Sequence, residues 1–239
     1  MKQPPSSSRL EPSVAITLPQ PLLPLICVGG PSAAGKSQLS AQLAAALRSQ
    51  GINPLPIACD DYYRCGWSGD GPYGFDTPAA IDSELLIQQL HAVRQGGLPP
   101  LRTYDMATRT SSWRQIQGPY EMVLLEGAYG LQQVLQQDDS ALLIYIDVPQ
   151  LQRLMRRLKR DVRQRQRQPL RVIRQMLGPV RRGEREFITP LKAMATVVLK
   201  GNRDQLSKVM PLIPRIQPTT GDTAALKDGA DRSHGSHDP

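Results

Sequence analysis

Five short apolar runs recur along the chain, and none of them alternates with polar residues. They cover residues 22–28, 55–59, 122–125, 142–148 and 196–199. Continuous apolar runs of this length are typical of strands that are buried on both faces, as in a parallel sheet with helices on each side. The pattern therefore predicts a central five-stranded parallel sheet.

Helical patterns lie between these runs. They cover residues 37–50, 82–94, 150–167, 170–181 and 203–212. The second of them has an acidic start at Asp82, a basic end at Arg94 and a glycine at Gly96, which are good boundary signals. Pro169 separates the two arginine-rich helices. Alternating strands and helices predict an α/β fold of three layers with right-handed crossovers.

The two ends of the chain differ from the middle. Residues 1–21 are rich in Pro and Ser, and residues 217–239 are mostly Thr, Gly, Asp, Ser and His. Segments with so few large apolar residues cannot bury a core. We expect two disordered tails around one folded domain at 22–216, which suits a chain of 239 residues.

Composition narrows the class of protein. Hydrophobic residues make up 40% of the chain and charged residues 21%, which is typical of a folded domain. No apolar run reaches the roughly 18 residues that a membrane helix needs, so no membrane association is expected. Three cysteines without a CxxC pair fit a reducing compartment, so we expect a cytoplasmic protein. Three histidines argue against His-based triads and metal sites.

The net charge of +8 is concentrated in one segment, because twelve arginines fall between Arg153 and Arg185. Apolar residues at three- and four-residue spacing give the first helix there an apolar stripe: Leu151, Leu154, Met155, Leu158 and Val162. A basic face opposite such a stripe is typical of a lid over phosphates, and it would also suit nucleic acid. No RNP, KH or helix-turn-helix signature supports nucleic acid. The segment is therefore predicted to form an arginine-rich helical lid at about 153–185.

The most specific motif is a phosphate-binding loop. Residues 30–37 read GPSAAGKS and match G-x-x-x-x-G-K-[ST]. The loop follows an apolar strand and opens an Ala/Leu-rich helix, so backbone N–H groups and the helix N-terminus face the phosphates. Lys36 reaches the β- and γ-phosphates, and Ser37 offers a hydroxyl to Mg²⁺. The expected nucleotide-binding residues are Gly30, Ser32, Ala33, Ala34, Gly35, Lys36 and Ser37.

An acidic pair follows the second strand. In parallel sheets, ligands bind beyond the carboxyl ends of the strands, and Asp60 stands at such an end. We therefore expect Asp60 to orient the acceptor hydroxyl and take its proton. Its neighbour Asp61 is expected to point elsewhere or to contact a metal through water.

Six further segments follow in an order that resembles the uridine kinase/phosphoribulokinase family of P-loop kinases. In one-letter code they read DDYY (60–63), YGFDTP (73–78), LRTYD (101–105), VLLEG (123–127), RLMRRLKRD (153–161) and FITPLK (187–192). The resemblance extends from about residue 25 to residue 212. It implies a P-loop NTPase fold in which an acceptor-binding hairpin, at about 62–117, joins the lid over the crevice.

The resemblance also implies roles for single residues. It implies ATP-dependent phosphorylation with Mg²⁺, most readily of the 5′-hydroxyl of uridine or cytidine. Asp60 matches the general base, Asp76 the carboxylate that binds ribose hydroxyls, and Glu126 the acid near Mg²⁺. Ser37, Glu126 and Asp60 are thus the expected metal-binding residues. The other matched positions are Tyr63, Phe75 and Tyr104 lining the nucleoside pocket, Gln175 near the ribose, catalytic Lys36, Arg156 and Arg160, and nucleotide-binding Arg165 and Arg167.

The acceptor hairpin departs from the family pattern. Arg109 stands where uridine kinases have a histidine that contacts uracil, and Ser111 replaces an arginine. Arginine only donates hydrogen bonds, so it suits a phosphate, a carboxylate or a carbonyl-rich acceptor. A hinge glycine is also absent from the lid, which reads QRQR at 164–167.

The sequence thus predicts an ATP-dependent kinase that acts on a small-molecule hydroxyl. Uridine or cytidine is the first acceptor. A sugar phosphate, glycerate, pantothenate or another nucleoside is the alternative, and Arg109 is expected to bind whichever acceptor is used. A non-catalytic nucleotide- or RNA-binding regulator is disfavoured because Lys36, Ser37, Asp60 and Glu126 are all present. The sequence is compatible with a homo-oligomer and does not settle it.

Overall fold

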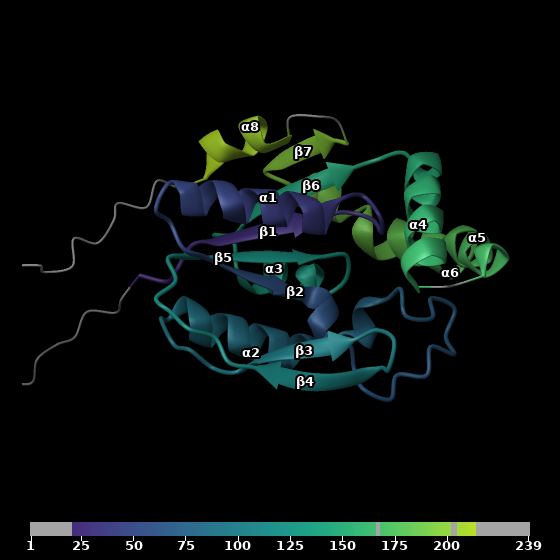
Figure 1. The fold of residues 1–239 in the computed structure, drawn as a ribbon, viewed down its shortest axis with the longest axis horizontal. Helices are drawn as coiled ribbons and strands as arrows, with labels where there is room; N and C mark the ends of the chain where they lie inside the picture. The colour runs from purple at the N-terminus through teal and green to yellow at the C-terminus, as the bar shows by residue number, and fades with distance from the viewer. Residues whose placement is uncertain (1–20, 166–167, 202–204, 214–239) are drawn as a thin grey trace, which may run out of the picture.

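The computed structural model describes residues 21–165, 168–201 and 205–213. Its centre is a parallel sheet in the order β2-β5-β1-β6-β7 (Figure 1). The strands are β1 (Leu25–Gly29), β2 (Pro54–Ala58), β5 (Met122–Gly127), β6 (Leu142–Asp147) and β7 (Val197–Lys200). This arrangement confirms the predicted five-stranded parallel sheet. Residues 1–20 and 217–239, which fall in the predicted tails, lie outside the described residues.

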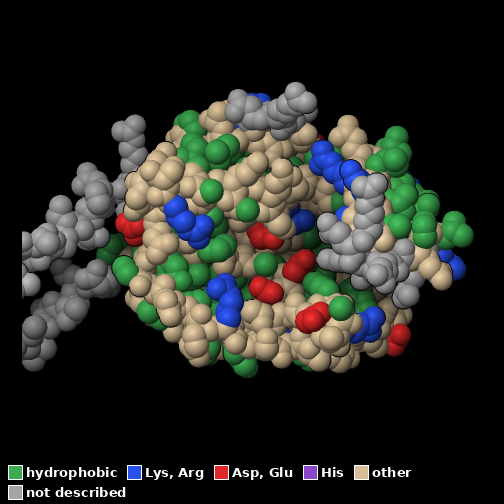
Figure 2. Space-filling view, viewed as in Figure 1, with side chains coloured by type: hydrophobic (Ala, Val, Ile, Leu, Met, Phe, Trp, Pro, Cys, Tyr) green, Lys and Arg blue, Asp and Glu red, His purple; other side chains and the backbone are tan. Residues whose placement is uncertain are grey.

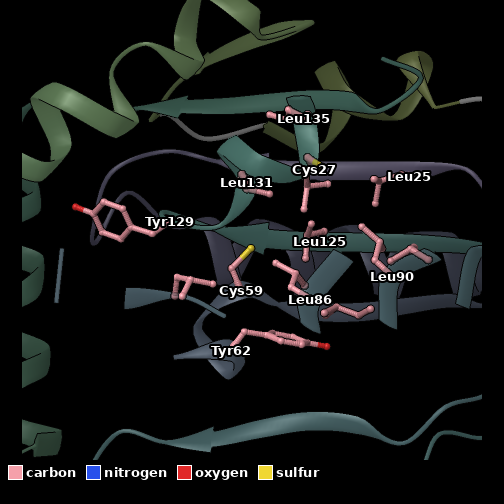
Figure 3. Close-up of a cluster of buried hydrophobic side chains, with 14 of the residues drawn as sticks. Leu25, Cys27, Cys59, Tyr62, Leu86, Leu90, Leu125, Tyr129, Leu131 and Leu135 are labelled. Atoms are coloured by element: carbon pink, nitrogen blue, oxygen red, sulfur yellow. The ribbon is translucent and has the colours of Figure 1, made fainter. Parts of the chain in front are cut away.

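Helices cover both faces of the sheet, which explains why its strands are apolar throughout. On one face, Ile26 and Val28 pack with α1 (Lys36–Ser49) and α8 (Gln205–Val209). On the other, Leu25 and Cys27 pack with α2 (Ser83–Arg94) and α3 (Leu131–Gln137). Figure 3 shows the second cluster, in which Leu125 of β5 lies among side chains from these helices. The fold therefore has three layers, as predicted.

Three helical segments differ from the sequence prediction. The helix α3 was not predicted, because it has only seven residues, although its buried Leu131, Val134 and Leu135 have helical spacing. The segment 170–181 forms two helices, α5 (Pro169–Leu177) and α6 (Pro179–Gly183), which meet at Gly178. A π-helical turn (Glu184–Ile188) and the short α7 (Leu191–Met194) follow. In the described part of the chain, no helix is both long and apolar enough to cross a bilayer.

A two-stranded antiparallel hairpin stands apart from the main sheet. It consists of β3 (Leu101–Asp105) and β4 (Thr110–Arg114), and it lies beside α2 in Figure 1. Arg102 fastens it to the body, since its guanidinium donates to the Tyr63 carbonyl at 2.6 Å and to Asp82 at 3.2 Å. The hairpin is thereby held near the residues that follow β2.

Candidate active site

The phosphate loop connects β1 to α1, and its backbone is unusual at three positions. Gly30, Ala33 and Gly35 have φ angles of 143°, 62° and 107°. A Cβ at residue 30 would lie 2.7 Å from the Ile146 carbonyl oxygen, so only glycine fits there. The Nζ of Lys36 donates to the Pro31 carbonyl at 3.1 Å, across its own loop. Burial lowers the pKa of Lys36, while Glu126 and Asp60 oppose that shift.

Three chain segments bring oxygen and nitrogen groups together at the carboxyl edge of the sheet. Ser37 Oγ donates to Glu126 Oε1 at 2.6 Å, from the start of α1 to the end of β5. Burial raises the pKa of Glu126, and the Ser37 hydrogen bond and Lys36 partly offset this. Asp60 follows β2 in a short 3₁₀ turn (Cys59–Tyr62), and its charge also raises the pKa of Glu126. The predicted groups therefore share one electrostatic environment.

The donor set around Ser37 and Glu126 suits Mg²⁺. No cluster of three or more His, Cys, Asp or Glu side chains that could hold a metal occurs in the described ranges. Mg²⁺ commonly takes one or two protein oxygens and completes its shell with phosphate oxygens and water. A hydroxyl beside a carboxylate, next to a phosphate loop, is such a partial site.

A cavity of about 330 Å³ opens beside this edge, between α1 and β2. Its lining includes Ser37, Asp61 and Glu126. Figure 2 shows acidic side chains around a hollow in the middle of this face. Asp61 is half-buried and accepts a hydrogen bond from the Tyr104 N–H at 3.2 Å, so it joins the strand end to the hairpin. Asp61 therefore lines the cavity next to Ser37 and Glu126 and is also tied to the hairpin.

Aromatic side chains from three segments meet beside the hairpin. The ring of Tyr63 lies 6.2 Å from that of Phe75 and 5.7 Å from that of Tyr104, between centroids. The guanidinium of Arg109 lies over the Phe75 ring, 4.9 Å from its centroid. Arg109 has a φ of 59° and is exposed at the turn between β3 and β4. The structure therefore brings four of the predicted acceptor residues together.

Asp76 follows this aromatic group in the chain and is the most perturbed carboxylate of the region. Burial raises its pKa to about 6, Arg157 opposes the rise, and Glu184 and Asp60 add to it. Gly183 packs so tightly against the Asp76 carbonyl that a Cβ there would clash with it. The hydroxyl of Tyr129 is buried nearby and has no hydrogen-bond partner among the described residues. No motif in the sequence points to Tyr129, which lies two residues beyond the strand segment that ends at Gly127.

The helix α4 (Gln150–Arg165) turns a polar face toward the phosphate loop. Arg153, Arg157 and Asp161 are 6%, 9% and 0% exposed, whereas Leu151 and Met155 of the apolar stripe are 70% and 61% exposed. Charged groups at this spacing are rarely buried unless they are paired. Leu154, Leu158 and Val162 of the same stripe are half-buried, so the stripe only partly coincides with the packed face of this helix.

The predicted lid residues have different surroundings. Arg156 donates to the Ala34 carbonyl at 3.3 Å, within the phosphate loop. Arg160 pairs with Asp161 at 2.9 Å, and its charge lowers the pKa of Lys36. Gln175 lies on α5 with its side-chain oxygen buried and without a partner among the described residues. The side chain of Arg165 and the whole of Arg167 lie outside the described residues.

Comparison with known proteins gives this arrangement a family. Residues 25–207 match the family model named Phosphoribulokinase / Uridine kinase family. The chain belongs to this family. A uridine kinase of Macrococcus caseolyticus is 31% identical over 158 residues, which cover 64% of this chain and 76% of that protein. One of Escherichia fergusonii is 30% identical over 150 residues, which cover 60% and 70%.

Solved structures support the fold of this family member. A candidate fructose transport system kinase from Silicibacter sp. TM1040 superposes with a TM-score of 0.60 at 20% identity, over 74% of this chain and 87% of that one. A possible uridine kinase from Bacillus stearothermophilus gives 0.50 at 23% identity, over 78% and 92%. The protein is thus a P-loop kinase, a phosphotransferase that binds a nucleotide and acts on a small molecule.

Proposed function

We propose that this kinase transfers the γ-phosphoryl group of ATP to the 5′-hydroxyl of uridine or cytidine. The observation that carries the proposal is the meeting of Lys36, the Ser37–Glu126 pair and Asp60 at one edge of the sheet. The curated relatives with about 30% identity are uridine kinases, which favours a pyrimidine nucleoside.

The phosphate side of the reaction rests on the loop and its lysine. Loop N–H groups and the Lys36 ammonium bind the phosphates, and positive charge there stabilises the charge that develops on the transferring group. Ser37 and Glu126 would hold Mg²⁺, which when bound neutralises charge on the β- and γ-phosphates. Arg156, which contacts the loop carbonyl of Ala34, supplies a further cation.

The acceptor side rests on two carboxylates and the aromatic group. Asp60 accepts the proton as the acceptor O–H bond breaks, the new O–Pγ bond forms, and the bond from Pγ to the ADP oxygen breaks. Asp76 accepts hydrogen bonds from the ribose hydroxyls. The rings of Tyr63, Phe75 and Tyr104 offer flat apolar surface for a base.

One observation favours a second acceptor class. The guanidinium of Arg109 stands over Phe75, at the mouth of the aromatic group, where the family's uridine kinases carry histidine. A guanidinium binds phosphate and carboxylate groups through paired N–H donors. An acceptor with an anionic group, such as a sugar phosphate or glycerate, is therefore the alternative.

A coupled ADP-release assay over a panel of hydroxyl acceptors tests the proposal. The panel holds uridine, cytidine, other nucleosides, sugar phosphates, glycerate and pantothenate, each with Mg²⁺ and ATP. We expect turnover above the acceptor-free rate with uridine or cytidine, and none of it in K36A. Turnover with an anionic acceptor alone would replace the first acceptor class by the second. ATP binding without turnover on any acceptor would reject the kinase assignment of this site.

A further inference from the structure

All three polar groups of Ser32, inside the phosphate loop, are held by side chains from the lid region. Its N–H donates to Glu184 Oε1 at 3.1 Å, its carbonyl accepts from Arg153 Nη1 at 3.3 Å, and its hydroxyl accepts from Arg157 Nη1 at 3.1 Å. These partners lie at least 121 residues away in the chain. We propose that Glu184, Arg153 and Arg157 form a clamp on Ser32 that fixes the phosphate loop in its nucleotide-binding conformation.

The Arg153–Glu184 pair within the clamp is rigid and electrically balanced. Arg153 and Glu184 pair at 2.6 Å, with side chains only 7% and 10% exposed. Arg153 also donates from Nε to the Val148 carbonyl at 2.9 Å, so its guanidinium is fixed from two sides. Because the arginine neutralises the carboxylate, Glu184 can accept the Ser32 N–H without adding net negative charge next to the phosphates. A buried ion pair with such additional hydrogen bonds is costly to break from one side.

The loop has a physical need for this support. Ala33 follows Ser32 directly and has a φ of 62°, a left-handed conformation that residues other than glycine rarely adopt. Such conformations persist where surrounding contacts over-determine them. Three contacts on the preceding residue supply that constraint, so the loop amides are oriented before the nucleotide arrives. Pre-organisation of this kind increases affinity because less order is lost on binding.

Isothermal titration calorimetry with ADP tests the clamp, using E184Q and a matched control. E184Q keeps the shape of the side chain and loses the charge that pairs with Arg153. The control is D138N, which changes a carboxylate that pairs with the buried Arg94, away from the phosphate loop. We expect E184Q to bind ADP roughly tenfold more weakly than wild type, the size of one lost charge-assisted hydrogen bond. D138N should bind ADP like wild type while losing a similar amount of thermal stability.

A second variant isolates one arm of the clamp. S32A removes only the hydroxyl that Arg157 holds and leaves both backbone contacts in place. We expect about threefold weaker ADP binding, less than for E184Q, since S32A breaks one hydrogen bond at the edge of the clamp and leaves the buried Arg153–Glu184 pair intact. If E184Q does not fold, the ADP affinity of S32A decides the question alone. An S32A affinity equal to that of wild type would then overturn the proposal.

The remaining outcomes separate the clamp from other roles of Glu184. Equal ADP affinity in E184Q and wild type would leave the residue with a purely structural role. Tighter binding would show that its carboxylate competes with phosphate, and this also contradicts the clamp. The inference rests on nucleotide binding at this loop. Absence of ADP and ATP binding in the wild-type chain would defeat the proposed function, whereas normal wild-type binding with an unaffected E184Q defeats the clamp alone.

Discussion

The nucleotide side and the acceptor side of this crevice are built in opposite ways. On the nucleotide side, consecutive residues form the phosphate-binding loop, and the buried side chains of Arg153 and Glu184 contact Ser32 within it. On the acceptor side, groups come from separate segments, and the hairpin strand β4 is exposed along most of its length. Arg109 stands at an exposed turn there.

This contrast indicates where chemistry and specificity reside. A rigid, buried nucleotide side fits phosphoryl transfer, because electrostatic stabilisation requires fixed dipoles. An exposed acceptor side can change its residues at little cost in stability, since surface substitutions away from special features usually cost little. The departures from the family pattern at Arg109 and Ser111 fall on this second side.

Asp60 lies between the two sides, and its substitution is the strongest test of the contrast. We expect D60N to lower kcat by roughly 10²–10⁴-fold, the range for loss of a general base. ADP affinity should change little, because the asparagine leaves the loop and Lys36 in place. Steady-state kinetics with the best acceptor from the panel, together with calorimetry, measure both quantities.

The adjacent carboxylate is the matched control for Asp60. Asp61 accepts the Tyr104 N–H, so D61N should act on the hairpin and raise the acceptor KM severalfold, with a smaller loss of kcat. A D60N enzyme with wild-type kcat would remove Asp60 as the base. Equal losses of kcat in both variants would show that Asp60 and Asp61, which both act on the charge of Glu126, do not have separate roles.

The pH dependence of stability tests whether Asp76, on the acceptor side, lowers the free energy of unfolding when it is ionised. Its pKa is raised from 3.8 to about 6 by burial, so the folded state holds its proton more tightly than the unfolded chain. Wild-type stability should therefore decrease as pH rises from about 4 to about 6, and remain lower above that range. The shift corresponds to at most about 3 kcal/mol.

D76N removes this penalty and the hydrogen-bond acceptor together. At pH 7.5 we expect the Tm to rise by roughly 5–10 °C, given about 2–4 °C per kcal/mol for a domain of this size. The acceptor KM should rise about tenfold, because an amide replaces a charged acceptor of ribose hydroxyls. Thermal denaturation and kinetics of the same preparations check both. A lower Tm with an unchanged KM would assign Asp76 a structural role instead.

The same carboxylate predicts a pH dependence that is specific to the acceptor. Protonated Asp76 has less capacity to accept hydrogen bonds, so kcat/KM for the acceptor should fall severalfold between pH 7 and pH 5.5, around the pKa of about 6. In D76N this component of the profile should be missing. Profiles of identical shape in wild type and D76N would place the titrating group elsewhere in the crevice.

What could be predicted from the sequence follows the same division. The loop at 30–37, Asp60 and Glu126 could be placed because each directly follows an apolar strand, and parallel strands end at a common edge. For the loop at 30–37, the local sequence motif is enough to predict the backbone turn and the position of the loop at the strand end. The five-stranded sheet could be predicted because both of its faces are buried, so that each strand is a continuous apolar run.

The clamp on Ser32 could not be predicted, because its geometry depends on which face of α4 packs inward. In the sequence, Arg153 and Arg157 look like Arg156 and Arg160, and the apolar stripe lies to one side of the buried arginines, with Leu151 and Met155 exposed. Only the docking of α4 onto the loop distinguishes them. Glu184 lies in a π-helical turn, which has no clear sequence signal. On the acceptor side, the contact of Arg109 with Phe75 joins segments 34 positions apart, through a turn that required a positive φ.

Arg109 offers the smallest effect and the sharpest comparison between acceptor classes. R109N suits the left-handed backbone, which asparagine tolerates, and it removes the charge. R109K keeps the charge but not the planar paired donors.

For a neutral nucleoside, both variants should raise the acceptor KM only roughly two- to fivefold, the value of an exposed cation–π contact. For an anionic acceptor, R109N should cost about tenfold or more and R109K less, because the lost interaction is then charge with charge. The ratio of the two KM changes, measured on uridine and on the best anionic acceptor, therefore separates the two classes. Equal KM values in both variants and wild type, on both acceptors, would show that this guanidinium only covers the Phe75 ring and takes no part in recognition.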